Sequence, residues 1–159
     1  MSNLAERWQV GMGELKIGAD DDQLRAVLGS CVGIGFLWKK GGCCGLAHCL
    51  LPEAPEPLAD IGARYVSQAV PSLLRAMGAC QADYADITVI LAGGASMFQT
   101  NSEHLQIGRR NVEAAQKYLR QCGLNVCVSE LGGHCGRQML IDCADQSYCI
   151  TPISTLERA

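Results

Sequence analysis

Apolar positions in the first third of the chain come in short runs that polar turns interrupt. Gly or Asp residues separate these runs, which cover residues 8–18, 23–29, 31–38 and 43–51. Runs of this length between turn residues are typical of β-strands. The segment 39–42, Lys-Lys-Gly-Gly, predicts a hairpin turn between the last two runs. We therefore expect the strands at 31–38 and 43–51 to lie side by side.

The middle of the chain changes to a helical spacing. Residues 52–59 hold three prolines in a short acidic stretch, which predicts an exposed connection without regular hydrogen bonds. From 60 to 77 the apolar residues recur on one helical face, and Asp60 is the predicted N-cap. Residues 108–122 show the same spacing, and Gly123 predicts the end of that helix.

Further strands are predicted at 87–93, at about 124–130, and at 137–142 and 147–151. Strands therefore dominate both ends of the chain while two helices lie in the middle. This order is not the strict alternation of strand and helix that a doubly wound parallel sheet requires. The sequence predicts an α+β fold, a layered α/β sandwich with mixed β-sheets and two main helices.

Composition and charge narrow the range of functions. The chain has 159 residues, enough for one domain with a sizeable core, and its 13 basic and 16 acidic residues are mixed along the sequence with a formal charge of −3. Such a balance gives no single-sign field, so we expect no binding to nucleic acid. The N-terminus lacks the uninterrupted apolar stretch of a signal peptide, and no run approaches the roughly 20 residues of a membrane span. These features predict a cytoplasmic protein without direct membrane insertion.

The chain contains ten cysteines. Because no export signal is present and a full-sized apolar core is available, we expect most of them to be reduced rather than paired in disulfides. Five of them stand in or beside apolar segments and are predicted to pack in the core as small hydrophobes: Cys80, Cys122, Cys127, Cys143 and Cys149.

One cysteine and one histidine stand out by their positions. In Leu-Gly-Ser-Cys-Val-Gly, Cys31 directly follows a small-residue turn, where a thiol and several backbone N–H groups can face one point. His48 lies in the neighbouring predicted strand, and an imidazolium within hydrogen-bonding reach lowers the pKa of a thiol. Cys31 and His48 are therefore candidate catalytic residues, with Ser30 in the turn. The plain alternative is a buried cysteine that opens a strand and a histidine satisfied within the core.

A competing interpretation is a zinc site built from the cysteines and the histidine of this region, Cys43, Cys44, His48 and Cys49, with Cys31 as a further ligand. The region has no CxxC pair, and strand alternation sends Cys44 and His48 to one face but Cys43 and Cys49 to the other. We therefore expect no metal. His134 and Cys135 form a second Cys/His pair, but adjacent residues on a strand point apart, so this segment is predicted to be a turn.

The segment Gly-Gly-Ala-Ser-Met-Phe at 93–98 follows a predicted buried strand. It lacks the glycine and lysine pattern of a phosphate-binding loop, which argues against nucleotide binding. We expect a strained loop in which Met97 and Phe98 either enter the core or are shown to a partner or substrate.

Five segments of the chain occur in the order and rough spacing of the CheD family, which this sequence resembles from about Gly13 to Ile150. They are LGSCVGIGFLW, LAHCLLPE, AGGASMF, IGRRNVEAAQKYLRQCGL and GGHCGR. The resemblance implies one deamidase domain over 1–159, with a core at about 8–151 and a fold like that of the cytotoxic necrotizing factor deamidases. It also implies conversion of selected glutamines on the cytoplasmic helices of chemoreceptors to glutamate, in some members with cleavage of glutamyl methyl esters.

The nucleophile of the family falls on Cys31 and its histidine on His48. The implied reaction is attack of the thiolate on the glutamine carbonyl, release of ammonia with a proton from His48, and hydrolysis of the thioester. Backbone N–H groups near Ser30 and Cys31 would hold the oxyanion. This chemistry needs no cofactor and no metal.

The chain departs from the family at one position. A threonine several residues before the cysteine usually orients the histidine, but residues 23–28 contain none, and Arg25 stands near its place. A guanidinium has only donors and cannot accept an imidazole N–H. We expect Arg25 to point outward while a backbone carbonyl or Ser30 orients His48; otherwise the pair is poorly held and the enzyme slow.

Two other functions remain open at this point. The first is a signalling adaptor that binds chemoreceptors or the phosphatase CheC, which the missing threonine favours and the intact Cys31 and His48 oppose. The second is a general thiol redox protein, which the cysteine count suggests but the lack of a CxxC motif opposes.

Overall fold

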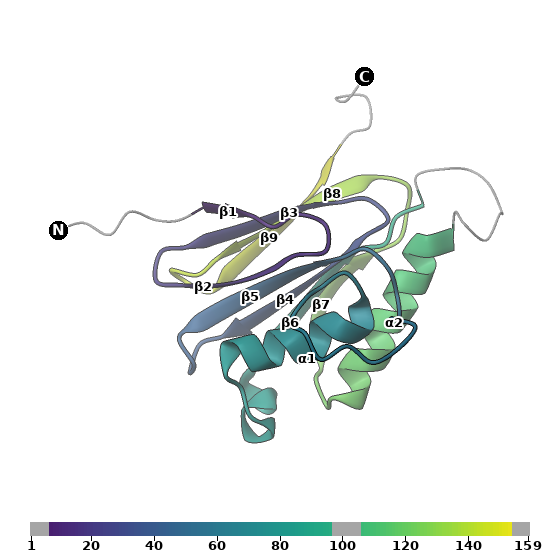
Figure 1. Cartoon of the computed structure of the whole chain (residues 1–159). Coiled ribbons are helices and arrows are strands. Elements are labelled where there is room, and N and C mark those ends of the chain that lie inside the picture. The colour runs from purple at the N-terminus through teal and green to yellow at the C-terminus, as the bar shows by residue number, and fades with distance from the viewer. Residues whose placement is uncertain (1–6, 97–105, 154–159) are drawn as a thin grey trace.

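The computed structural model describes residues 7–96 and 106–153, whose strands form two sheets (Figure 1). The five-stranded sheet has the order β2 (Leu15–Ala19), β5 (Cys43–Cys49), β4 (Val32–Trp38), β6 (Thr88–Gly93) and β7 (Val126–Leu131). The four-stranded sheet has the order β1 (Arg7–Gln9), β3 (Gln23–Leu28), β8 (Gly136–Asp142) and β9 (Ser147–Ile153). Each sheet contains one parallel pair, β6 with β7 and β1 with β3, so both sheets are mixed as predicted.

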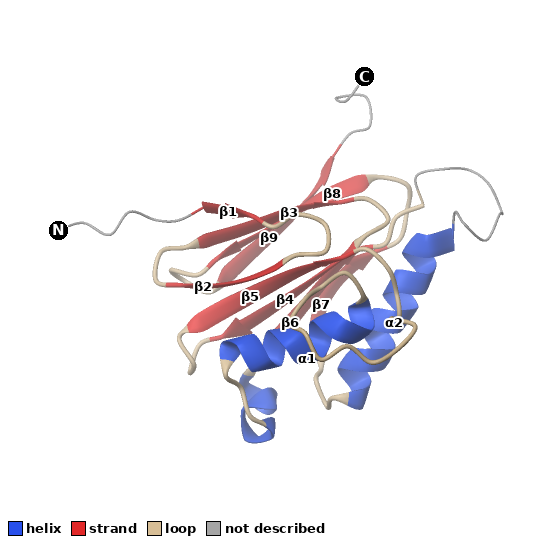
Figure 2. Cartoon of the chain, viewed as in Figure 1, coloured by secondary structure: helices blue, strands red, loops and turns tan. Residues whose placement is uncertain are grey.

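Three layers make up the fold (Figure 2). The helices α1 (Val66–Met77) and α2 (Ile107–Gln121) cover one face of the five-stranded sheet, and the four-stranded sheet covers the other face. A short 3₁₀ helix, η1 (Gln81–Asp86), precedes β6. The predicted α+β sandwich with two main helices is therefore confirmed. Among the described helices, none is long and apolar enough to cross a membrane.

The layers enclose two apolar cores on either side of β4, whose residues are all buried. Val32, Ile34 and Phe36 pack against the helices, while Leu37 faces the four-stranded sheet. Burial of a side chain such as Phe36 stabilises the fold by roughly 1.5–3 kcal/mol. The two sheets approach closely over Gly33, where an added Cβ would lie 2.9 Å from side-chain atoms of Leu28 and Met139. The middle layer is thus held from both sides.

The run at 8–18, predicted as one strand, is divided between the two sheets. β1 pairs with β3 in the four-stranded sheet, and β2 pairs with β5 in the five-stranded sheet. The chain changes sheets in the turn around Gly13, whose φ of 82° lies in the left-handed region that glycine adopts at little cost. The segment therefore connects the two layers of the sandwich.

The helix predicted from residue 60 begins only at Val66. Tyr65 is extended and serves as its N-cap, and Leu51 forms an isolated β-bridge with Tyr65. This pairing holds the preceding segment in an extended form and overrides its helical spacing. Asp60 is therefore not the cap, and Ile61 is half exposed rather than buried. The second helix matches its prediction closely and is followed by Gly123 with a φ of 76°.

Candidate active site

Cys31 and His48 lie at the same end of the five-stranded sheet. Cys31 occupies the turn between β3 and β4, and His48 is near the end of β5. β4 and β5 form the predicted antiparallel hairpin, in which Gly33 is paired directly with His48. Because side chains alternate with a period of two, Cys31 is a diagonal neighbour of His48 on the face toward the four-stranded sheet. Both residues are nearly enclosed, with exposures of 5% and 4%.

A backbone carbonyl fixes the orientation of the histidine ring. The Nδ1 of His48 lies 2.9 Å from the carbonyl oxygen of Val10. Since a carbonyl can only accept, Nδ1 carries the hydrogen and Nε2 keeps its lone pair in the neutral ring. Val10 is itself held by its N–H, which donates to the carbonyl of Arg25 at 2.7 Å. A backbone carbonyl thus orients the ring, in a chain that has no threonine at residues 23–28.

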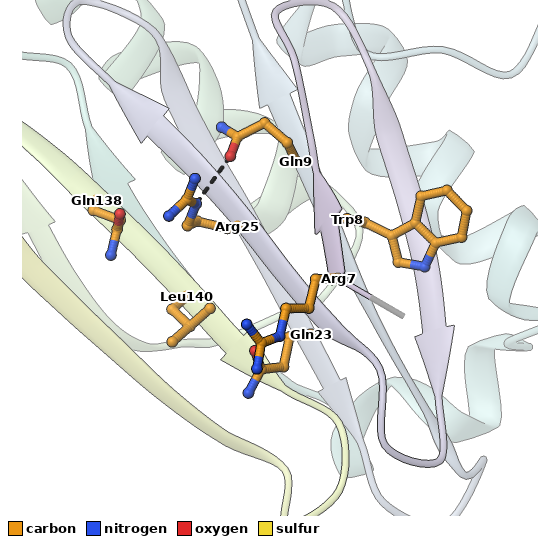
Figure 3. A pocket seen from close by; sticks show the side chains of 7 residues that line it. All are labelled: Arg7, Trp8, Gln9, Gln23, Arg25, Gln138 and Leu140. Atoms are coloured by element: carbon orange, nitrogen blue, oxygen red, sulfur yellow. Dashed lines mark hydrogen bonds between the residues drawn. The ribbon is translucent and has the colours of Figure 1, made fainter. Parts of the chain in front are cut away.

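The side chain of Arg25 points away from this site. It lies on the exposed face of β3, while its neighbours Leu24 and Ala26 face the core. Its Nε donates to the side-chain oxygen of Gln9 at 2.9 Å, and both residues line a surface cavity of about 350 Å³ on the outer face of the four-stranded sheet (Figure 3). The expectation that Arg25 points outward and a backbone carbonyl orients His48 is confirmed.

Burial controls the charge of both groups. It raises the pKa of the Cys31 thiol above its ordinary value. It also lowers the pKa of His48, against the opposing effects of the Val10 hydrogen bond and the charge of Glu14. The resting site therefore favours a neutral thiol and a neutral imidazole. This differs from the imidazolium-activated thiolate expected from the sequence, because transfer of charge into an enclosed apolar space is unfavourable.

Within the described ranges, no hydrogen bond joins the sulfur of Cys31 to the ring of His48. Catalytic hydrogen bonds are often long in the free enzyme and tighten when substrate binds. The neutral imidazole with a free Nε2 is the form that can accept a proton from the thiol at that moment. The arrangement therefore suits general-base activation of Cys31 better than a preformed ion pair.

The turn that carries Cys31 is anchored by three successive carbonyl oxygens. Gly29 accepts from the N–H of Ala95 at 2.9 Å, Ser30 from the side-chain amide of Asn111 at 3.0 Å, and Cys31 from the N–H of Gly94 at 2.8 Å. In a trans peptide the N–H points opposite to the carbonyl. The N–H groups of Ser30 and Cys31 are therefore directed away from these anchors, which is the orientation an oxyanion site requires. Ser30 contacts Asn111 through its backbone carbonyl.

The glycine segment after β6 is a backbone support for this turn. Gly93 has a φ of 106°, and a Cβ at this position would lie only 2.2 Å from the carbonyl oxygen of Cys31. Only glycine allows so close an approach in the left-handed region. A loop follows β6 as far as Ser96, as expected, and its positive φ angles are at Gly93 and Gly94, which adopt them without strain. Met97 and Phe98, predicted to bind a partner, lie outside the described residues.

Asn111 is a further site residue that the sequence reasoning missed. It projects from α2, is completely buried, and its Nδ2 donates to the carbonyls of Ser30 at 3.0 Å and Leu50 at 3.1 Å. Asn111 thus ties the turn of Cys31 to the chain just after His48. The sequence could have indicated this residue, because Asn111 lies on the buried stripe of the helix, four residues before Ala115 and eight before Leu119. A polar amide at such a position needs a buried hydrogen-bond partner.

The other candidate groups of cysteine and histidine do not form a site in the described residues. Cys43 and Cys49 face the helices, whereas Cys44 and His48 face the four-stranded sheet, so the proposed zinc ligands are divided as the alternation predicts. The predicted turn at His134 and Cys135 is confirmed as an exposed loop. Its histidine Nδ1 lies 3.0 Å from the carbonyl oxygen of Ser96.

The predicted core cysteines are only partly in the core. Cys143 is buried and Cys122 half-buried, but Cys80, Cys127 and Cys149 are exposed. Cys127 and Cys149 lie on β7 and β9, the edge strands of their sheets, where one face of the strand remains open to solvent. Apolar character of the surrounding segment was therefore an insufficient guide to burial.

Comparisons with known proteins agree with the resemblance seen in the sequence. Residues 50–151 match the family described as CheD chemotactic sensory transduction, a stretch that begins after Cys31 and His48. A "probable chemoreceptor glutamine deamidase CheD" of Bdellovibrio bacteriovorus is 37% identical over 143 residues, which is 89% of this chain and 91% of the relative. A protein of the same name from Methanococcus maripaludis strain C5 is 35% identical, with 94% and 97% covered. The chain belongs to the CheD family.

Proposed function

We propose that this protein is a chemoreceptor glutamine deamidase that converts side-chain amides of receptor glutamines to carboxylates through a thioester on Cys31. The observation that carries the proposal is an enclosed thiol beside an imidazole whose Nδ1 hydrogen is held by the Val10 carbonyl. The relatives reported above carry the name of this activity.

In the first step the Nε2 of His48 takes the proton of the Cys31 thiol as the sulfur attacks the amide carbon. The new imidazolium is stabilised through Nδ1–H by Val10, and the oxyanion is held by the N–H groups of Ser30 and Cys31. Collapse of the tetrahedral intermediate breaks the C–N bond, and His48 gives its proton to the departing ammonia. Attack by water, activated by the neutral ring, then releases glutamate and the free thiol.

The adaptor function loses its main support in this geometry. It was favoured by the missing threonine, but the orienting acceptor is the backbone oxygen of Val10, which does not depend on the side chain at position 25. Because the substrate glutamines lie on cytoplasmic helices, the proposal places the protein in the cytoplasm. A CheC-type phosphatase remains a proposed second partner.

The direct test is incubation of the purified protein with a chemoreceptor cytoplasmic fragment, followed by mass spectrometry of the fragment peptides. Each deamidated glutamine gains about 1 Da as an amide becomes a carboxylate. We expect the gain at a small set of glutamines. A fragment whose peptide masses stay unchanged over many hours, although it binds the protein, would favour the adaptor instead.

Replacement of Arg25 by alanine should leave the deamidation rate within about threefold of wild type. The guanidinium contacts Gln9 on the outer face of the sheet, and the backbone carbonyl that holds Val10 is retained in the variant. Initial rates on the same receptor fragment measure the effect, with Gln9→Ala as the matched control on the other side of the same hydrogen bond. A hundredfold change in either direction would show that the Arg25 side chain influences His48 after all.

A further inference from the structure

Two thiols meet between the sheets at the end of the molecule opposite to the candidate active site. Cys44 is near the start of β5, whereas His48 is near its end, and Cys143 directly follows β8. Both belong to the apolar core between the two sheets. Neither takes part in the proposed reaction.

The positions of the two sulfur atoms follow from the strand register. Gly18 on β2 is paired with Cys44 on β5, and side chains of directly paired residues project from the same face. An added Cβ on Gly18 would lie 2.9 Å from the Sγ of Cys143. The sulfur of Cys143 therefore occupies the space that the missing side chain of Gly18 leaves open, immediately beside Cys44.

Hydrogen bonds hold the turn of Cys143 against the start of β5. The N–H of Cys143 donates to the carbonyl of Asp22 at 2.9 Å. The side-chain amide of Gln146, in the same turn, donates to the carbonyl of Cys43 at 3.2 Å. The juxtaposition of the two thiols is thus fixed by one backbone hydrogen bond and one side-chain hydrogen bond.

We propose that Cys44 and Cys143 form a modification site at which a peroxide-class oxidant closes a reversible disulfide between the two sheets. This goes beyond the deamidase function and does not depend on it. Cys143 is 6% exposed while Cys44 is fully enclosed, so the oxidant reaches Cys143 first. The sulfur of Cys143 attacks one peroxide oxygen and forms a sulfenic acid with loss of water. The sulfur of Cys44 then attacks the sulfenic sulfur, and a second water leaves as the S–S bond forms.

The chemical environment supports this order of events. A hydrogen bond from Cys44 lowers the pKa of Cys143 against the opposing effects of burial and of the nearby carboxylates of Asp22, Asp142 and Asp20. The same contact and burial raise the pKa of Cys44. The thiolate, which is the reactive form, therefore forms more readily on Cys143, the more accessible sulfur, than on Cys44. Oxidation consumes two thiols and one peroxide and yields two waters, and a dithiol reductant reverses the reaction.

The test uses the full-length protein treated with hydrogen peroxide and then with a thiol-alkylating reagent. We expect a cross-linked pair of chymotryptic peptides, one with Cys44 and one with Cys143, whose mass is about 2 Da below the sum of the two free peptides. Treatment with dithiothreitol should release the two free peptides. The disulfide closes a loop of about 100 residues, so the Tm should rise by about 5 °C or more on oxidation.

Single substitutions decide which thiols form the bond. Cys44→Ala and Cys143→Ala should each abolish the cross-link and the rise in Tm. Cys43→Ala, which removes the thiol next to Cys44, and Cys149→Ala, which removes an exposed thiol on β9, should retain both. Circular dichroism of the reduced variants checks that they are folded. A cross-link that survives in Cys44→Ala, or wild-type protein that accumulates only sulfinic acid at Cys143, would overturn the proposal.

Discussion

Replacement of Cys31 by alanine should lower the deamidation rate by at least about 10⁴-fold, equivalent to about 5 kcal/mol of barrier, while the fold stays intact. The variant keeps the turn, whose carbonyls remain anchored by Ala95, Asn111 and Gly94. It loses the atom that forms the thioester. The His48–Val10 hydrogen bond on its own cannot carry the reaction, because it orients a base that no longer has a nucleophile to activate.

The matched controls for this variant are Cys43→Ala and Cys49→Ala. Both cysteines lie on β5, Cys49 directly after His48 and Cys43 at the far end of the strand, and both face the helices rather than the other sheet. Their rates should stay within about threefold of wild type, provided that the proteins remain folded. Loss of activity in a folded Cys43→Ala or Cys49→Ala protein would mean that the assignment of the nucleophile is wrong and that a metal site deserves reconsideration.

Replacement of Asn111 by leucine should reduce both stability and rate. Leucine is of similar size, but it removes the donor shared by the carbonyls of Ser30 and Leu50. Two part-buried acceptors without partners cost about 1–3 kcal/mol each, so the free energy of unfolding should fall by about 2–6 kcal/mol. The turn of Cys31 is then no longer tied to the chain after His48, and a misplacement of about 1 Å lowers the rate by about 100-fold.

Chemical denaturation measures the change in stability, and the rate is measured at a temperature where the variant is fully folded. Gln116→Leu provides the control, since it removes an amide from the exposed face of the same helix. It should change neither quantity appreciably. If Asn111→Leu lost stability but kept the wild-type rate, Asn111 would support the fold without positioning the two reacting groups.

The fold was predictable wherever local pattern and tertiary pairing agree. The hairpin of β4 and β5 follows from two apolar runs and the turn at 39–42, and the buried stripe of α2 follows from its spacing. The start of α1 was predicted wrongly because the bridge between Leu51 and Tyr65 overrides the local helical preference. The run at 8–18 was also misjudged, since its apolar spacing does not reveal that the chain changes sheets at Gly13.

In the candidate site, too, local features were predictable and long-range contacts were not. Cys31 and His48 could be found because a motif and a predicted hairpin place them near each other. The partners that hold them could not, because they act over long separations in the sequence: Val10 lies 38 residues from His48, and Asn111 lies 81 residues from Ser30. Val10 also acts through its carbonyl, a group that every residue type possesses.

Because Val10 acts through its backbone carbonyl, side-chain mutagenesis can reveal little about how His48 is oriented. A scan of position 10 replaces an apolar side chain and reports on packing, but each variant still presents the same main-chain oxygen to Nδ1. The role of the acceptor becomes visible only when the backbone itself is altered. In a semisynthetic protein with an ester in place of the amide between Val10 and Gly11, the carbonyl would be a weaker acceptor and the ring would be free to turn. The role of the Val10 carbonyl must therefore be tested in a chemically synthesised protein, because gene mutagenesis changes only side chains.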